Sequence, residues 1–228
     1  ETGVDFLNSA AAALGPGLPR AHVHMLGNLG KSISPMVSMM RLRGRFDRCV
    51  LIAHREDTPG FVRLVAGLPG HVVAVNEVIA RPFRDAGHDR VVVEYGVTNA
   101  DWFYPPPALS LSDGCIHFVV MGMLDNAWKG ADTDIEAFGR LPESLRERCR
   151  LHLASYTDPP LFDDPHIRGY TWMPRSDVPE FLRGMDVMLV PSRDEDVMRE
   201  TFSQVVVQGM LTGLPVVVSD LPILREKV

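Results

Sequence analysis

The sequence predicts an α/β protein made of two Rossmann-like domains. Short runs of apolar, mostly β-branched residues alternate with segments of helical periodicity in both halves of the 228-residue chain. A proline-rich stretch at 105–114, which ends in a Ser/Asp/Gly cluster, separates the two halves. The segment 187–220 has the order strand, loop, helix, strand, which is the unit of a parallel sheet.

The first half, predicted as residues 1–108, alternates between the two kinds of element. A serine and a proline at 34 and 35 suit a helix start, whereas Pro82 lies inside a helical pattern that it weakens. We expect strands at 21–26, 49–53, 72–75 and 91–94, and helices at 5–14, 35–43, 61–66 and 77–86.

The second half, predicted as residues 109–228, repeats the alternation. Its last helix has the apolar spacing of one buried face and is stopped by Gly213 and Pro215. We expect strands at 115–121, 150–154, 187–190 and 216–218, and helices at 132–140, 178–184 and 202–211. Because residue 1 is not Met and the chain stops just after a strand, both domains are expected to be incomplete at the chain ends.

Composition excludes several classes of protein. The net charge is −6 and no basic run is present, which argues against a nucleic-acid partner. Cys49, Cys115 and Cys149 are far apart and odd in number, so they fit reduced thiols better than disulfides or a zinc site. No apolar run approaches the roughly 20 residues of a membrane helix. We expect a cytoplasmic protein, either free or resting on the inner face of the membrane.

The loop at 192–201 and the helix start after it form the first candidate site. In a parallel sheet, ligands bind beyond the carboxyl ends of the strands. Free backbone N–H groups at a helix start attract anions, phosphates above all. Glu200 lies at this start. Taken alone, it is best explained as a first-turn carboxylate that suits the helix dipole.

This stretch resembles the donor-binding segment of family 4 of the retaining nucleotide-sugar glycosyltransferases, which have the GT-B fold. The residues that carry the resemblance are Pro191-Ser192, Glu200-Thr-Phe202-Ser203, Gln208-Gly-Met210, Gly213-Leu-Pro215-Val-Val and Ser219-Asp220. The resemblance implies that Glu200 acts on the donor sugar and that Thr201, Phe202, Ser203 and Gln204 supply backbone donors. Gln208 stands where the family has a ribose-binding glutamate, so that contact would lack a charge.

The segment 118–130 resembles the family's second donor motif, G-R-L followed by K-G. Gly122, Leu124, Lys129 and Gly130 match it, whereas Met123 stands in place of the arginine. The resemblance implies that Lys129 lies on the donor diphosphate and neutralises the leaving group. The simpler explanation of Lys129 is a solvated loop lysine. The change at Met123 removes bidentate phosphate recognition.

The first half carries two candidate histidines. His22 and His24 lie two apart on one predicted strand and share a face. The family has a similar strand end, and the resemblance implies that His24 lies near the reacting sugar; a hydrogen-bonded core histidine is an equally good reading. His54, at the next strand end, resembles a residue that lines the acceptor-side cleft. Spacing places no third ligand beside these histidines, so no metal site is expected.

The resemblance implies transfer of a sugar from a UDP- or GDP-sugar to a hydroxyl acceptor with retained anomeric configuration. The acceptor would be a glycan, a lipid-linked molecule or a small molecule, and neither a cofactor nor a divalent metal would be needed. Two rival functions stay open. A non-catalytic relative would bind a sugar nucleotide or a protein partner, which Met123 and Gln208 favour. A sugar-nucleotide epimerase of the same fold is the other; a dinucleotide enzyme is disfavoured because no strand is followed by G-x-G-x-x-G.

Overall fold

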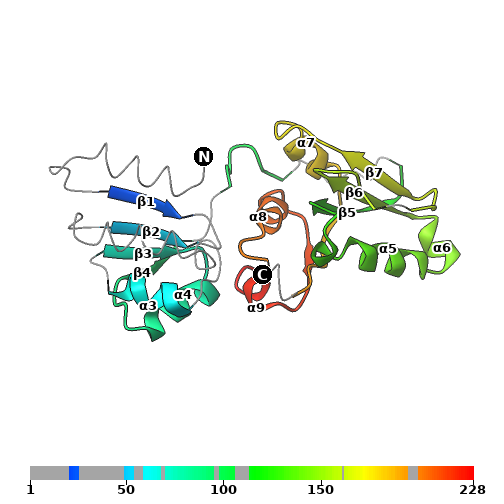
Figure 1. The fold of residues 1–228 in the computed structure, drawn as a ribbon. Coiled ribbons are helices and arrows are strands. Elements are labelled where there is room, and N and C mark those ends of the chain that lie inside the picture. The colour runs from blue at the N-terminus through cyan, green and yellow to red at the C-terminus, as the bar shows by residue number, and fades with distance from the viewer. Residues whose placement is uncertain are drawn as a thin grey trace. The chain divides into compact units, whose positions relative to one another are not determined.

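The computed structural model describes residues 21–25, 49–53, 59–67, 70–94, 98–105, 113–160, 162–194 and 200–228. The chain forms two compact units, residues 1–96 and 97–228, and each contains one parallel sheet flanked by helices (Figure 1). The predicted α/β class is therefore confirmed. The predicted boundary after residue 108 and the helices predicted at 5–14 and 35–43 lie outside the described residues.

The first unit holds a four-stranded sheet with the order β1-β2-β3-β4, all parallel. Each strand had been predicted within two residues of its bounds. The strands are β1 (Ala21–Met25), β2 (Cys49–Ala53), β3 (Gly70–Ala74) and β4 (Val91–Val93), and the helices are α3 (Pro59–Ala66) and α4 (Glu77–Asp85). Helix α4 packs on β3, β4 and α3.

Helix α4 forms in spite of Pro82. Asn76 caps it, because its buried side-chain oxygen accepts a hydrogen bond of 2.8 Å from the N–H of Ile79. Ile79, Ala80 and Phe83 are buried against the sheet. A proline inside a helix costs about 3 kcal/mol, and the burial of these three side chains offsets that cost.

The second unit holds a five-stranded parallel sheet with the order β7-β6-β5-β8-β9. Its strands are β5 (Ile116–Gly122), β6 (Cys149–Ser155), β7 (Ile167–Thr171), β8 (Val187–Val190) and β9 (Val216–Val218). Its helices are η3 (Ala127–Lys129), α5 (Ala131–Gly139), α6 (Glu143–Arg146), α7 (Val178–Arg183), α8 (Gln204–Leu211) and α9 (Pro222–Arg225). Of these, β7, η3, α6 and α9 were not predicted.

Two apolar cores lie on opposite faces of this second sheet, because successive side chains of a strand point to opposite faces. Val119 and Met121 of β5 join the core that α7, α8 and α9 cover. Val120, between them, joins the core that α5 covers with Phe138. Figure 1 shows α5 and α7 on opposite sides of the sheet. Burial on both faces explains why residues 118–121 of β5 form a continuous apolar run.

The strand order reverses between β5 and β8. From β5 the chain moves outward in one direction, through β6 to β7. It then crosses back and continues on the other side of β5, through β8 to β9. The loops after β5 and β8 therefore diverge at the carboxyl edge of the sheet. This is the topological switch point, where open α/β sheets bind their ligands.

Residues just before the proline-rich stretch pack on the second unit. Phe103 is buried in the core of α7 and α8. The guanidinium of Arg183 lies 4.4 Å from the centroid of the Tyr104 ring, and one of its N–H groups donates to the carbonyl oxygen of Trp102 at 3.3 Å. These contacts explain why the compact second unit begins at Val97.

Two further expectations concern the cysteines and the membrane. Cys115 and Cys149 are buried free thiols, as predicted. Among the described residues, no helix is long and apolar enough to cross a membrane.

Candidate functional site

Lys129 and Glu200 form an ion pair at the switch point of the second sheet. The Nζ of Lys129 lies 2.7 Å from Oε2 of Glu200, although the two residues are 71 positions apart. Lys129 is the last residue of η3, in the connection after β5, and Glu200 lies in the connection after β8. Only 14% and 6% of their side chains are exposed, so the pair is shielded from water. Separating the pair would leave a buried charge without its partner, so the pair ties the two loops together.

Both oxygens of the Glu200 carboxylate are engaged. Oε2 also accepts a hydrogen bond of 3.2 Å from the hydroxyl of Ser192, which is buried at the end of β8. Oε1 accepts a hydrogen bond of 3.0 Å from the backbone N–H of Ser203. Glu200 therefore joins three segments: the connection after β5, the end of β8 and the start of α8.

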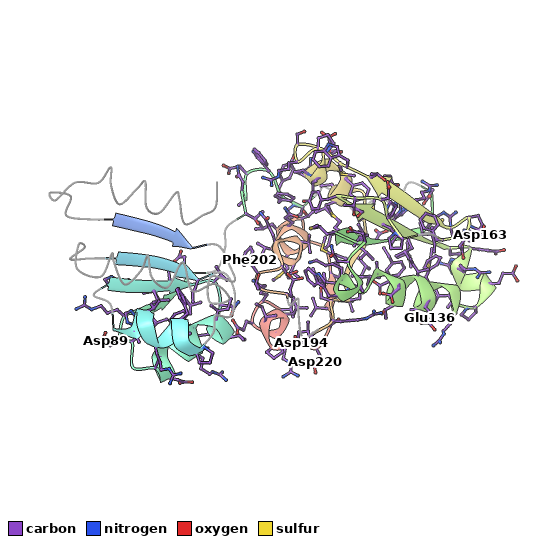
Figure 2. The ribbon with its side chains drawn as sticks, in the orientation of Figure 1. Asp89, Glu136, Asp163, Asp194, Phe202 and Asp220 are labelled. Atoms are coloured by element: carbon purple, nitrogen blue, oxygen red, sulfur yellow. The ribbon has the colours of Figure 1, made fainter. Side chains whose placement is uncertain are left out.

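Helix α8 begins two residues later than predicted. Ser203 precedes it in the left-handed conformation, with φ 45°, so Phe202 lies ahead of the helix rather than in it (Figure 2). A left-handed residue ends the regular helical pattern, which apolar spacing alone could not reveal. The Oγ of Ser203 is buried, and no described residue hydrogen-bonds to it.

The remaining residues predicted for the donor site lie along the same segment. Thr201 is half-buried and precedes Phe202. Gln204 is exposed in the first turn of α8, and Gln208 lies half-buried one turn further on. The N–H of Ser203 donates to Oε1 of Glu200, and its predicted role toward a ligand stays a prediction.

Gly122 shapes the other side of the site. It ends β5 with φ 141°, a conformation that favours glycine. A Cβ at this position would lie 3.5 Å from Cε of Lys129. This is an ordinary van der Waals distance, so the Lys129 stem runs directly past Gly122. Met123, the next residue, is 48% exposed and brings no charge to this edge.

The connections after β5 and β8 are also tied together directly. The N–H of Arg193 donates to the carbonyl oxygen of Trp128 at 2.7 Å, and its guanidinium pairs with Asp132 at 2.8 Å. The Nζ of Lys129 lies 4.3 Å from the centroid of the Trp128 ring. No sequence motif pointed to this role of Arg193.

The two histidines predicted for the acceptor side belong to the first unit. His24 lies in β1, paired in register with Ile52 of β2, one residue before the strand ends. His54 lies outside the described residues. Their predicted roles stay predictions. Among the described residues, no group of three or more His, Cys, Asp or Glu side chains could hold a metal ion.

Comparison with known families identifies the second unit. Residues 116–228, from the start of β5 to the end of the chain, match the family described as glycosyl transferases group 1. The second unit is a group 1 glycosyltransferase domain. A sequence comparison with curated proteins finds no match.

Solved structures extend the likeness to nearly the whole chain. A sucrose-phosphate synthase from Thermosynechococcus elongatus matches 97% of this chain over 61% of its own, with a TM-score of 0.69 and 17% identity. A UDP-forming α,α-trehalose-phosphate synthase from Burkholderia xenovorans matches 98% of this chain over 63% of its own, with a TM-score of 0.69 and 13% identity. WaaG, a glycosyltransferase involved in lipopolysaccharide biosynthesis, matches 94% of this chain over 75% of its own, with a TM-score of 0.56 and 18% identity.

These matches show the fold. The chain has the GT-B architecture, with two parallel-sheet units as predicted. The chain spans about three fifths of the length of the two synthases, at 61% and 63%.

Proposed function

We propose that this group 1 glycosyltransferase chain acts in the transfer of a sugar from a nucleoside-diphosphate donor to a hydroxyl acceptor, with retained anomeric configuration. The observation that carries the proposal is the Lys129–Glu200 pair at the switch point, beside the start of α8. An ammonium, a carboxylate and a helix N-terminus within one shielded site suit a ligand that has both a diphosphate and sugar hydroxyls.

Charge development explains the role of Lys129. In the transfer, the bond from the anomeric carbon to the β-phosphate oxygen breaks and its electron pair stays on the phosphate. The acceptor oxygen bonds to the anomeric carbon and its hydroxyl proton is released. The diphosphate gains negative charge, which the Lys129 ammonium and the first N–H groups of α8 stabilise.

Glu200 orients the donor sugar, because a carboxylate accepts hydrogen bonds from sugar hydroxyls. Gln208, one turn into α8, bonds a ribose hydroxyl through a neutral amide. Thr201, Phe202 and Gln204 supply backbone groups around the phosphates. Gly122 lies beside the Lys129 stem.

The acceptor hydroxyl belongs to a glycan, a lipid-linked molecule or a small molecule, and the acceptor-side roles predicted for His24 and His54 are part of this proposal. We propose chemistry without a metal ion or a cofactor. One similar structure is a UDP-forming enzyme, which makes UDP-sugars the first donors to test and GDP-sugars the second. A cytoplasmic location, free or at the inner face of the membrane, stays a prediction from the cysteine pattern.

A non-catalytic relative that binds a sugar nucleotide or a protein is the second candidate. Met123 is uncharged and 48% exposed at the very edge where a phosphate-binding arginine is expected. Gln208 is also neutral, and it stands where the family has a ribose-binding glutamate. Two missing charges in one pocket weaken phosphate and ribose binding, so this candidate has a specific physical basis.

Calorimetry on the full-length protein tests both candidates. UDP-sugars and GDP-sugars are titrated into the wild type, Glu200→Ala and Lys129→Ala, with Glu136→Ala and Arg140→Ala as controls, since those two residues form an exposed pair on α5. We expect one donor to bind, and each site variant to weaken it by about tenfold or more. The controls should bind as the wild type does.

Product analysis with the bound donor then separates the functions. A glycosylated acceptor with retained configuration supports the proposal, an epimerised sugar nucleotide supports the epimerase, and no turnover supports the non-catalytic relative. If no sugar nucleotide binds the wild type, the donor-site assignment is wrong.

A further inference from the structure

Lys227 lies at the candidate donor site, although it follows α9 near the end of the chain. Its Nζ lies 3.9 Å from the centroid of the Phe202 ring and is buried. Phe202 stands between Glu200 and Ser203, the two residues that close the start of α8. The fold thus places a second ammonium beside the segment that holds the Glu200 carboxylate. No sequence motif pointed to this lysine.

Electrostatics connects Lys227 to Glu200. Burial lowers the pKa of Lys227, while the carboxylate of Glu200, and to a lesser degree that of Glu226, acts in the opposite direction. An ammonium taken out of water loses its hydration, and other groups have to stabilise its positive charge. The face of an aromatic ring supplies part of it, and a nearby carboxylate supplies more. Lys227 therefore belongs to the same charge cluster as the Lys129–Glu200 pair.

The charge balance of this cluster calls for a second cation. Lys129 is bonded to Glu200, so that pair is neutral as a whole. A donor diphosphate carries two negative charges, and one more develops as the sugar leaves. At this edge Met123 is uncharged. One neutral ion pair and a helix N-terminus leave most of the diphosphate charge uncompensated.

We propose that Lys227 is a donor-binding residue, whose ammonium supplies the second positive charge that holds the diphosphate of the nucleotide sugar. This rests on the proposed function. Lys227 balances Glu200 when Lys129 turns toward the phosphates, so that the carboxylate is not left as an uncompensated buried charge. The aromatic face of Phe202 fixes the lysine at this place.

Three variants of the full-length protein test the proposal by calorimetry with UDP and GDP as probes. Lys227→Met keeps an unbranched stem over Phe202 and removes the charge. Lys227→Arg keeps the charge. Arg225→Met is the matched control, because Arg225 ends α9 two residues before Lys227, is exposed, and is paired with Asp220 at 2.6 Å.

We expect Lys227→Met to weaken the better-bound diphosphate by about tenfold or more, the loss of one charge-assisted contact. Lys227→Arg should stay within about threefold of the wild type, and Arg225→Met within about twofold. The matching nucleoside, uridine or guanosine, should bind Lys227→Met and wild type equally. The salt dependence of diphosphate binding should also become weaker in Lys227→Met.

Other results overturn the proposal. Unchanged diphosphate binding by Lys227→Met would remove Lys227 from the site and leave the proposed function intact. An equal loss of nucleoside and diphosphate affinity, or a tenfold loss in Lys227→Arg, would mean that the lysine acts only through packing. Lys227→Gln repeats the measurement if the methionine variant does not fold. A wild type that binds neither UDP nor GDP would overturn the proposed function and this proposal together.

Discussion

Gly130 lies so close to Pro191 that a Cβ at position 130 would be 2.1 Å from the Pro191 carbonyl oxygen. Gly130 also has φ 69°, a left-handed conformation that links η3 to α5. The connection after β5 therefore meets the end of β8 backbone to backbone. This close approach holds Lys129 within reach of the loop that carries Glu200.

A Gly130→Ala substitution should lower the free energy of unfolding by about 2 kcal/mol or more, since it adds left-handed strain and a clash with backbone. Gly139→Ala is the control, because a Cβ there meets nothing within 4 Å at the end of α5. It should leave stability unchanged or raise it by about 0.5 kcal/mol. Urea unfolding measures both. Equal effects of the two changes would contradict the close approach.

The Lys129–Glu200 pair should behave as one unit in a double-mutant cycle. Lys129→Met leaves a buried carboxylate without its cation and should cost about 3 kcal/mol of unfolding free energy. Glu200→Gln should also destabilise the protein. The double variant should be more stable than the sum of the single losses predicts, because it also removes the carboxylate that Lys129→Met leaves without its bonded cation. Additive losses would show that the two side chains do not interact in solution.

Asp134, in the first turn of α5, should make the protein less stable as the pH rises. Burial, and then the charge of Asp132, raises the pKa of Asp134 to about 7 from 3.8. Between these values the folded chain binds more protons than the unfolded chain, so unfolding free energy falls as the pH increases. Allowing for solvent screening, the loss from pH 5 to pH 8 is about 1 kcal/mol.

Asp134→Asn should abolish this part of the pH dependence and raise stability at pH 8 by about 1 kcal/mol. Glu136→Gln, an exposed position on the same helix, is the control. Unfolding curves at pH 5 and pH 8 measure the effect. A variant with the wild-type pH profile would show that Asp134 ionises normally in the folded protein.

A chain of hydrogen bonds through His117 and His152 should make the protein less stable as the pH falls, which is opposite to the effect of Asp134. Nε2 of His152 lies 2.9 Å from Nδ1 of His117, and Nδ1 of His152 lies 3.0 Å from the Tyr170 hydroxyl. Nε2 of His117 lies 3.0 Å from the Asp113 carboxylate. All three hydrogen bonds form when each ring is neutral and carries its proton on Nε2. The Tyr170 hydroxyl then donates to Nδ1 of His152, Nε2 of His152 donates to Nδ1 of His117, and Nε2 of His117 donates to Asp113.

The pKa of His152 is lowered from 6.5 to about 4, and burial is the largest cause. The charges of His117, Arg168 and Arg150 also lower it, and the charge of Asp113 raises it. Between these values the unfolded chain binds more protons, so stability present above pH 6.5 is lost as the pH falls toward 4. After allowance for screening, the loss from pH 7 to pH 5 is about 1 kcal/mol.

His152→Gln keeps one donor and one acceptor and does not titrate, so it should flatten the stability profile between pH 5 and pH 7. Urea unfolding at the two pH values measures the change. An unaltered slope in His152→Gln would assign the acid sensitivity to other groups.

Local patterns in the sequence determined the elements and the class of fold. The apolar runs of β5 and β8 and the helical spacing of α8 are patterns within short segments, and they show which face of each element is buried. The motif around Glu200 and the one around Lys129 marked two loops as ligand-binding. Strand β7 was missed because Ile167–Thr171 is an edge strand, mostly exposed, with a glycine and an arginine in place of an apolar run.

Only the tertiary structure decided how these loops meet. That Lys129 lies 2.7 Å from Glu200 follows from the strand order, which puts β5 beside β8. The left-handed turn at Ser203, the role of Arg193 and the place of Lys227 over Phe202 follow from packing between segments distant in sequence. Periodicity records which side of an element is buried, whereas the partner of a buried charge is set by the elements that the fold brings to it.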